Sequence, residues 1–179
     1  MIVYAFDNEF PWPHCPASGH RAGDVVATEV LESDTVLKTV ELIKNSVRFL
    51  NQGERSIWLL RLCCHGNAGV MWLGEGVRAR NAHQFRGLAD WMTPGGRGVE
   101  IHGCGVGSDD SILQDALPIC RRGSFGSPTG LGRIFLLKLA AAFGVPVTGA
   151  INCQRSDRLF RFEGPTVTAY PDGGIRRPW

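Results

Sequence analysis

Two segments of the sequence each end in a side chain that can take part in covalent catalysis. The apolar run over residues 57–64 leads directly to His65, and the shorter run over residues 99–103 leads directly to Cys104. A thiolate attacks an acyl carbon readily, and an imidazole titrates near neutral pH and can protonate a leaving amine. A cysteine and a histidine held side by side therefore favour nucleophilic acyl transfer.

The apolar pattern of the chain predicts the elements that position these two residues. A strand over residues 25–31, an amphipathic helix over 35–50 and a nearly continuous apolar strand over 57–64 form a β-α-β unit. Such a unit is typical of a parallel sheet that is buried on both faces. Arg61 is an anomaly in the last of these strands, because a buried charge needs a partner and the sequence does not identify one.

The rest of the chain extends the same pattern. Further strands are predicted over residues 2–6, 70–73, 99–103 and 145–150, further helices over 81–91 and 130–143, and a C-terminal hairpin over 159–162 and 166–170. No internal repeat or linker divides the chain, so a single domain over residues 1–179 is expected. The predicted fold class is α/β, with a mostly parallel central sheet, helices on both faces and a C-terminal hairpin.

The expected place of the two reactive side chains is one edge of this sheet. Ligands of a parallel α/β sheet bind outside the carboxyl ends of its strands. Neighbouring strands lie about 4.8 Å apart, so His65 and Cys104 can face one substrate group if their strands are neighbours. Glycine beside a reactive residue lets the backbone approach a substrate closely, and Gly66, Gly103 and Gly105 occupy such positions.

The composition of the chain narrows the classes of partner and compartment. The chain is 44% hydrophobic and 20% charged, which argues against disorder, and a net charge of +2 without a basic patch argues against nucleic acid or a membrane surface as partner. No apolar run reaches the roughly 18 residues that span a bilayer. The N-terminal residues lack the features of a secretory signal, so a cytoplasmic location with reduced cysteines is predicted, although export by a signal-independent route stays open.

The two motifs also resemble a known superfamily in their order and spacing. The segments that carry the resemblance are Cys64–Gly69, Met71–Gly74, Ile101–Cys104, Gly132–Leu137 and Gly144–Val147. In this order they resemble the caspase-like superfamily of cysteine peptidases, which includes legumains, gingipains and separases. They are most similar to uncharacterised bacterial caspase-like modules that are often carried in large surface proteins. The resemblance covers roughly residues 50–153.

The resemblance implies a caspase-like three-layer sandwich and a peptidase with His65 and Cys104 as its catalytic dyad. Backbone N–H groups of Gly66 and Cys104 would bind the oxyanion, no cofactor would be needed, and the partner would be a peptide or protein substrate. The sequence His-Gly-Cys-Gly stands where caspases carry a Gln-Ala-Cys-Arg-Gly type of motif. The resemblance therefore implies no specificity for cleavage after Asp, and the sequence leaves the oligomeric state open.

Three residues near the motifs have both a functional and a structural interpretation. Asp109 and Asp110 either line a pocket for a basic substrate side chain or are solvated loop carboxylates. His102 shares a strand face with Cys104, so it either lies in the substrate pocket or is a hydrogen-bonded core histidine.

Two alternatives to a peptidase remain. The first is a catalytically silent caspase-like module that binds a partner protein. The second is a zinc site formed by Cys64, His65, His102 and Cys104, because thiolate and imidazole are ligands that suit zinc.

Overall fold

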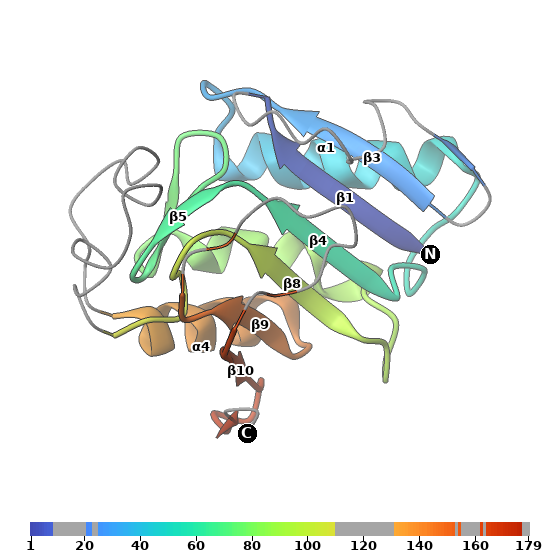
Figure 1. Cartoon of the computed structure of the whole chain (residues 1–179). Coiled ribbons are helices and arrows are strands. Elements are labelled where there is room, and N and C mark those ends of the chain that lie inside the picture. Colours follow the sequence, from blue (N-terminus) through green and yellow to red (C-terminus); the bar gives the residue numbers. More distant parts are fainter. Residues whose placement is uncertain are drawn as a thin grey trace.

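The structure, a computed structural model, has an α/β fold with one large and one small sheet (Figure 1). It describes residues 1–8, 21–22, 25–109, 131–152, 154, 162 and 164–176. The large sheet has eight strands in the order β11-β10-β9-β8-β4-β1-β3-β2. Their bounds are β1 Ile2–Asp7, β2 Arg21–Ala22, β3 Val25–Val30, β4 Leu59–Cys63, β8 Gly98–His102, β9 Val147–Ala150, β10 Thr166–Ala169 and β11 Ile175–Arg176.

The central strands of the large sheet are parallel, as the sequence predicts. β3, β1, β4, β8 and β9 pair in parallel, whereas β2, β10 and β11 each pair antiparallel with their neighbours. The hairpin at the C-terminal side of the sheet joins β10 to β11. The other predicted hairpin strand, over residues 159–162, lies outside the described residues except for Phe162.

The described part of the chain contains three helices. They are α1 Val36–Phe49, the 3-10 helix η1 Ala82–Trp91 and α4 Gly132–Phe143. The hydroxyl of Thr35 accepts a hydrogen bond from the Lys38 N–H and so caps α1. Gly144 ends α4 with a left-handed φ of 68°, a conformation that glycine adopts without a steric cost. The predicted helix over 81–91 therefore forms, but with the tighter 3-10 geometry.

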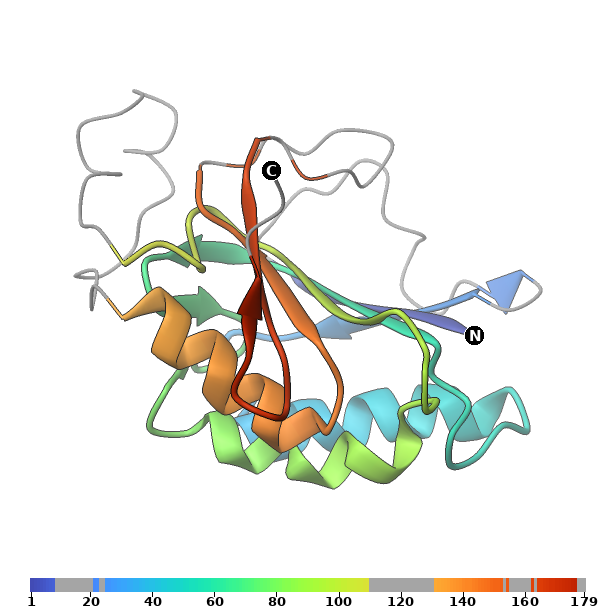
Figure 2. The ribbon, with the colours of Figure 1, turned by 90° about the horizontal axis from the view of Figure 1, so that it is seen from below.

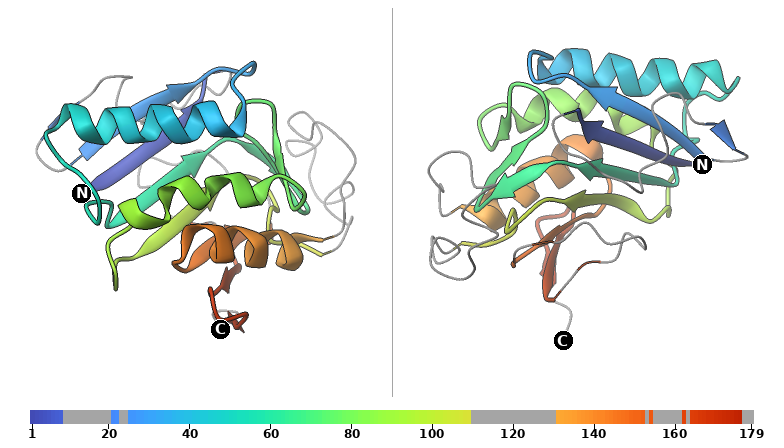
Figure 3. Two further views of the ribbon diagram at one scale, coloured as in Figure 1. Left: turned by 180° about the vertical axis from the view of Figure 1, so that it is seen from behind. Right: turned by 45° about the horizontal axis from the view of Figure 1, so that its top comes forward.

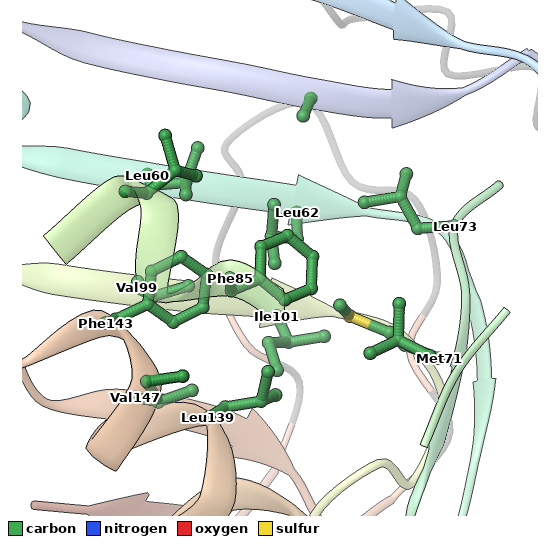
Figure 4. Packing of buried hydrophobic residues seen from close by; sticks show 14 of the residues in the cluster. Leu60, Leu62, Met71, Leu73, Phe85, Val99, Ile101, Leu139, Phe143 and Val147 are labelled. Atoms are coloured by element: carbon green, nitrogen blue, oxygen red, sulfur yellow. The ribbon is translucent and has the colours of Figure 1, made fainter. Parts of the chain in front are cut away.

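All three described helices lie on one face of the large sheet (Figures 2 and 3). The sheet residues that point toward them are apolar and alternate along each strand. Figure 4 shows this packing for Leu60, Leu62, Val99, Ile101 and Val147 of the sheet against Phe85 of η1 and Leu139 and Phe143 of α4. The described part of the chain thus has a single helix layer, and the second helix layer that the sequence predicts is not present in it.

The order of the parallel strands creates a point where the chain changes direction across the sheet. The chain runs one way from β1 to β3 and then the other way through β4, β8 and β9. In open α/β sheets ligands bind at such a point, outside the carboxyl ends of the strands. The carboxyl ends of β1, β4 and β8 are therefore the place to look for a site.

Other expectations are met only in part by the described residues. None of the helices in the described ranges is long and apolar enough to cross a membrane. Cys63, Cys64 and Cys104 form no disulfide bond, whereas Cys15, Cys120 and Cys153 lie outside the described residues. The cytoplasmic location and the single domain over residues 1–179 stay predictions.

Candidate functional site

The segments that carry His65 and Cys104 lie side by side at the carboxyl edge of the large sheet. β4 and β8 are parallel neighbours, with Cys63 opposite His102. Beyond the strands, the backbone N–H of Cys64 donates to the carbonyl oxygen of His102 at 3.3 Å. His65 and Cys104 therefore follow directly from two paired strand ends, which is the juxtaposition that the sequence could state only as a condition.

Gly66 provides the closest contact between the two segments. A Cβ atom at this position would lie 3.0 Å from the carbonyl oxygen of Cys104, 3.2 Å from its nitrogen and 2.5 Å from Cγ1 of Val106. The distance to Val106 is shorter than real Cβ atoms show, and the two backbone distances are tighter than most, so a side chain at position 66 would require Val106 and the Cys104 backbone to shift. The glycine thus allows these two segments to approach closely, while the expected close approach of the backbone to a substrate stays a prediction.

A small three-stranded sheet carries His65. Its strands are β5 His65–Asn67, β6 Val70–Trp72 and β7 Val77–Arg78, and it stands at the carboxyl end of β4 (Figure 1). Asn67 pairs with Val70 across a two-residue turn, and His65 pairs with Trp72. Because residues of an antiparallel pair direct their N–H groups alternately toward and away from the partner strand, the Gly66 N–H points away from β6, at the outer edge of β5.

The end of β9 and the residues that follow it make hydrogen bonds to the turn around Cys104. The N–H of Gln154 lies 3.3 Å from Sγ of Cys104, and the thiol can donate to the carbonyl oxygen of Gln154 at 3.5 Å. The N–H groups of Gly105 and Gly107 donate to the carbonyl oxygens of Asn152 and Ala150, both at 2.9 Å. These contacts link the half-buried Cys104 and its turn to the segment that follows β9.

Asp7 and Cys64 lie at the buried side of the same edge. Burial raises the pKa of the Cys64 thiol well above its ordinary value, the charges of Asp7 and Cys104 add to this, and a hydrogen bond from the backbone of Trp72 opposes it. Cys64 is therefore protonated at neutral pH, as expected for a buried structural thiol. Asp7 is only 5% exposed although it ends β1, and sequence reasoning missed it because a single carboxylate after a strand usually begins a loop.

Arg61 has the partner that the sequence could not identify. Its Nε donates to Oε2 of Glu100 at 2.9 Å, and its Nη1 donates to the hydroxyl of Tyr4 at 2.7 Å. Arg97 pairs with the other oxygen of Glu100 at 2.7 Å, and Nε2 of His102 lies 3.3 Å from Oε2. These five residues, here called the charge cluster, lie on the sheet face opposite the helices.

The charge cluster determines the state of Glu100 and His102. Burial acts to raise the pKa of Glu100, but hydrogen bonds from His102 and Arg61 and the charges of both residues outweigh it and lower the pKa to about 2. An ionised carboxylate only accepts hydrogen bonds, so Nε2 of His102 carries the proton that it donates to Glu100. The His102 ring is 3% exposed and stacks on Phe162 with 4.6 Å between ring centroids, contacts that match a hydrogen-bonded core histidine.

Asp109 contacts the start of α4, and its predicted place in a substrate pocket stays a prediction. Its Oδ1 accepts from the backbone N–H of Arg133 at 2.9 Å, and its Oδ2 lies 2.6 Å from Nε of the same residue. A carboxylate at the first turn of a helix satisfies an N–H group that has no partner within the helix. Asp109 therefore anchors the start of α4, and Asp110 lies outside the described residues.

The predicted alternative of a zinc site does not agree with the geometry. Within residues 25–109 and the other described ranges, no group of three or more His, Cys, Asp or Glu side chains is placed to hold a metal ion. Cys64 belongs to the apolar core on the helix side, whereas His102 belongs to the charge cluster on the opposite face. The four proposed ligands therefore do not converge.

No family model, curated protein or solved structure matches the chain. Its function is therefore inferred from the chemistry of the site. The site offers a half-buried thiol, an imidazole on the neighbouring segment and a backbone N–H at the outer edge of β5.

Proposed function

We propose that this protein is a caspase-like cysteine peptidase, with Cys104 as the nucleophile and His65 as the general acid. The observation that carries the proposal is the close approach of Gly66 to the backbone of Cys104, because it brings the two residues to neighbouring strand ends. Their place outside the carboxyl ends of parallel strands is where α/β sheets bind ligands.

The proposed reaction has two steps. The Cys104 thiolate attacks the carbonyl carbon of a peptide bond, and the oxyanion that forms accepts hydrogen bonds from backbone N–H groups of Gly66 and Cys104. His65 then donates a proton to the leaving amine as the carbon–nitrogen bond breaks and a thioester remains. In the second step water loses a proton to His65 and attacks the thioester, which releases the new carboxyl group and restores the Cys104 thiolate and the protonated His65.

The order of elements along the chain supports a caspase-like topology as the finer description of the fold. A parallel strand followed by His-Gly and a hairpin, then the next strand followed by Gly-Cys, and then the glycine-bearing helix α4 occur in the order of the resemblance. Gly132 lies so close to Gly107 and Ser108 that a side chain there would clash with their backbone. This contact explains why a glycine begins the helix that follows the Cys104 turn.

The first test is covalent labelling. We expect a peptidyl acyloxymethyl ketone to alkylate the wild-type protein once, at Cys104, as read by intact mass and peptide mapping. Cys104→Ala abolishes the labelling, and His65→Ala slows it. Cys63→Ala is the matched control, because this thiol on β4 is completely buried and inaccessible to the reagent. Labelling that persists in Cys104→Ala would contradict the assignment of the nucleophile.

The second test is turnover of a quenched-fluorescent peptide library with residues on both sides of every candidate bond. We expect cleavage by the wild-type protein and its loss in Cys104→Ala. Labelling of Cys104 without turnover of any library peptide would reject the peptidase and leave the catalytically silent binding module. The library also identifies the residue that the protein prefers before the cleaved bond. The contacts of Asp109 do not determine this preference.

A further inference from the structure

Trp72 has a buried polar atom without a partner. Its indole Nε1–H is buried, and no acceptor in the part of the chain that the structure describes makes a hydrogen bond to it. Burying a donor without an acceptor lowers the stability of a protein, so such a group needs a physical reason. One reason is that the acceptor belongs to a ligand.

The position of Trp72 relates this donor to the candidate site. Trp72 on β6 lies directly opposite His65 on β5, and residues in that relation project their side chains on the same face of the small sheet. The neighbouring pair, Gly66 and Met71, contacts the Cys104 backbone and the apolar core. The indole and the imidazole are thus cross-strand neighbours.

The neighbours of the indole determine where its N–H edge lies. A Cβ at Gly76 would come 3.1 Å from Cε3 of the ring, so the benzene edge of the indole rests on this glycine. Nε1 belongs to the opposite edge of the ring. The guanidinium carbon of Arg78 lies 5.2 Å from the ring centroid, a cation–π contact that holds the ring from one side.

We infer that Trp72 is a substrate-binding residue whose indole N–H donates to a backbone carbonyl oxygen of the peptide on the leaving-group side of the cleaved bond. The inference rests on the proposed function. In that reaction His65 protonates the leaving amine, so the residues after the cleaved bond pass His65 and reach β6. An indole N–H is a donor only, and an extended peptide offers a carbonyl acceptor at each residue.

The kinetic experiment compares two substrates that differ only after the cleaved bond. One is the best library peptide, and the other is the same peptide with an aminocoumarin amide in place of the residues after the bond. In Trp72→Phe we expect the ratio of kcat/KM for the full peptide to kcat/KM for the truncated peptide to fall about fivefold to tenfold, the loss of one hydrogen bond. Trp58→Phe, at the amino end of β4, is the matched control, and its ratio stays that of the wild type.

Two kinetic results would overturn the inference. An equal loss for both substrates in Trp72→Phe means that the ring supports His65 or the fold, not the leaving-group side. An unchanged ratio with unchanged rates means that the N–H contacts no substrate atom.

A binding experiment leaves Trp72 intact and does not depend on turnover. In ¹⁵N-labelled Cys104→Ala, the indole signal of Trp72 is identified as the one absent from the spectrum of the Trp72→Phe, Cys104→Ala double variant. We expect this signal to shift downfield on titration with the full peptide, while the Trp58 signal does not move. A stationary Trp72 signal at saturating peptide would contradict the inference.

Failure of the proposed function gives a different pattern. If the wild-type protein cleaves no library peptide, the peptidase is rejected, and the pooled library replaces the single peptide in the binding experiment. A shift of the Trp72 signal then supports a peptide-binding residue without catalysis. A stationary signal overturns both proposals.

Discussion

One face of the large sheet lies under α1, η1 and α4 and buries almost only apolar side chains, whereas the other face carries the charge cluster on its central strands. On the helix side, Leu62 and Ile101 gain stability in proportion to the apolar area that they remove from water, with little dependence on direction. On the opposite side, Arg61 and Glu100 gain stability only if their hydrogen bonds have the correct geometry. The two faces should therefore respond to substitution in different ways.

The candidate site lies where these two environments meet. Cys64 extends the helix side and is part of the apolar core, while His102 extends the opposite side and pairs with Glu100. His65 and Cys104 follow directly from these two strand ends.

The largest expected effect is on the apolar face. Phe143 is completely buried and stacks on Phe85 with 4.9 Å between ring centroids. Phe143→Ala should lower the free energy of unfolding by about 4 kcal/mol, because it removes a large buried side chain and leaves a cavity. Urea unfolding followed by circular dichroism measures this change. A loss below about 1 kcal/mol would show that the apolar face is loosely packed.

The next effect is on the charge cluster. Glu100→Gln removes the negative charge that partners Arg61, whose side chain is 13% exposed. We expect the free energy of unfolding at neutral pH to fall by about 3 kcal/mol, because a buried charge without its partner is costly. Arg97→Gln is the matched control: it removes the outermost charge of the cluster, which is 56% exposed, and should cost less than about 1 kcal/mol.

The pH dependence separates the charge of Glu100 from its packing. The folded-state pKa of Glu100 is about 2, below its ordinary value of 4.5, so ionised Glu100 stabilises the folded state above pH 4.5. This contribution is lost as the pH falls through 4.5 toward 2. The difference in melting temperature between the wild-type protein and Glu100→Gln should therefore shrink over that range. A difference that stays constant would assign the effect to packing.

The smallest effect is expected at the start of α4. Asp109 and Arg133 form an ion pair whose side chains are 34% and 42% exposed, so solvent screens their attraction. Asp109→Asn keeps an acceptor for the Arg133 N–H and should lower the free energy of unfolding by less than about 1 kcal/mol. Chemical denaturation with Asp172→Asn as a surface control measures it. A loss as large as that of Glu100→Gln would mean that this exposed ion pair stabilises the fold as much as the buried pair does, which contradicts the prediction.

Much of the fold could be predicted because its signals are local. The three- and four-residue spacing of Val36, Val40, Ile43 and Val47 describes the buried side of α1, and Gly144 marks the end of α4. The prediction of helices on both faces rested on the continuous apolar strands, because such strands are typical of a sheet that is buried on both faces. In the described residues, Tyr4, Ala27 and Cys63 bury part of the second face without a described helix above them.

Of the candidate site, only the reactive residues and their glycine neighbours could be predicted from the sequence. His65, Gly66 and Cys104 have recognisable types and neighbours in the sequence, but Gln154 and Asp7 have no such signal and reach the site through strand order. Glu100 is separated from Arg61 by 39 residues, and the two become partners only because β4 and β8 pair in one register.

By itself the sequence determined which segments form strands and helices and which side chains can react, because periodicity and residue chemistry are properties of neighbours along the chain. Only the tertiary structure decided that the His65 and Cys104 segments touch, that Arg61 meets Glu100 and that the indole of Trp72 lies beside His65. Those contacts depend on the order and register of strands, which hydrogen bonds between distant parts of the chain determine.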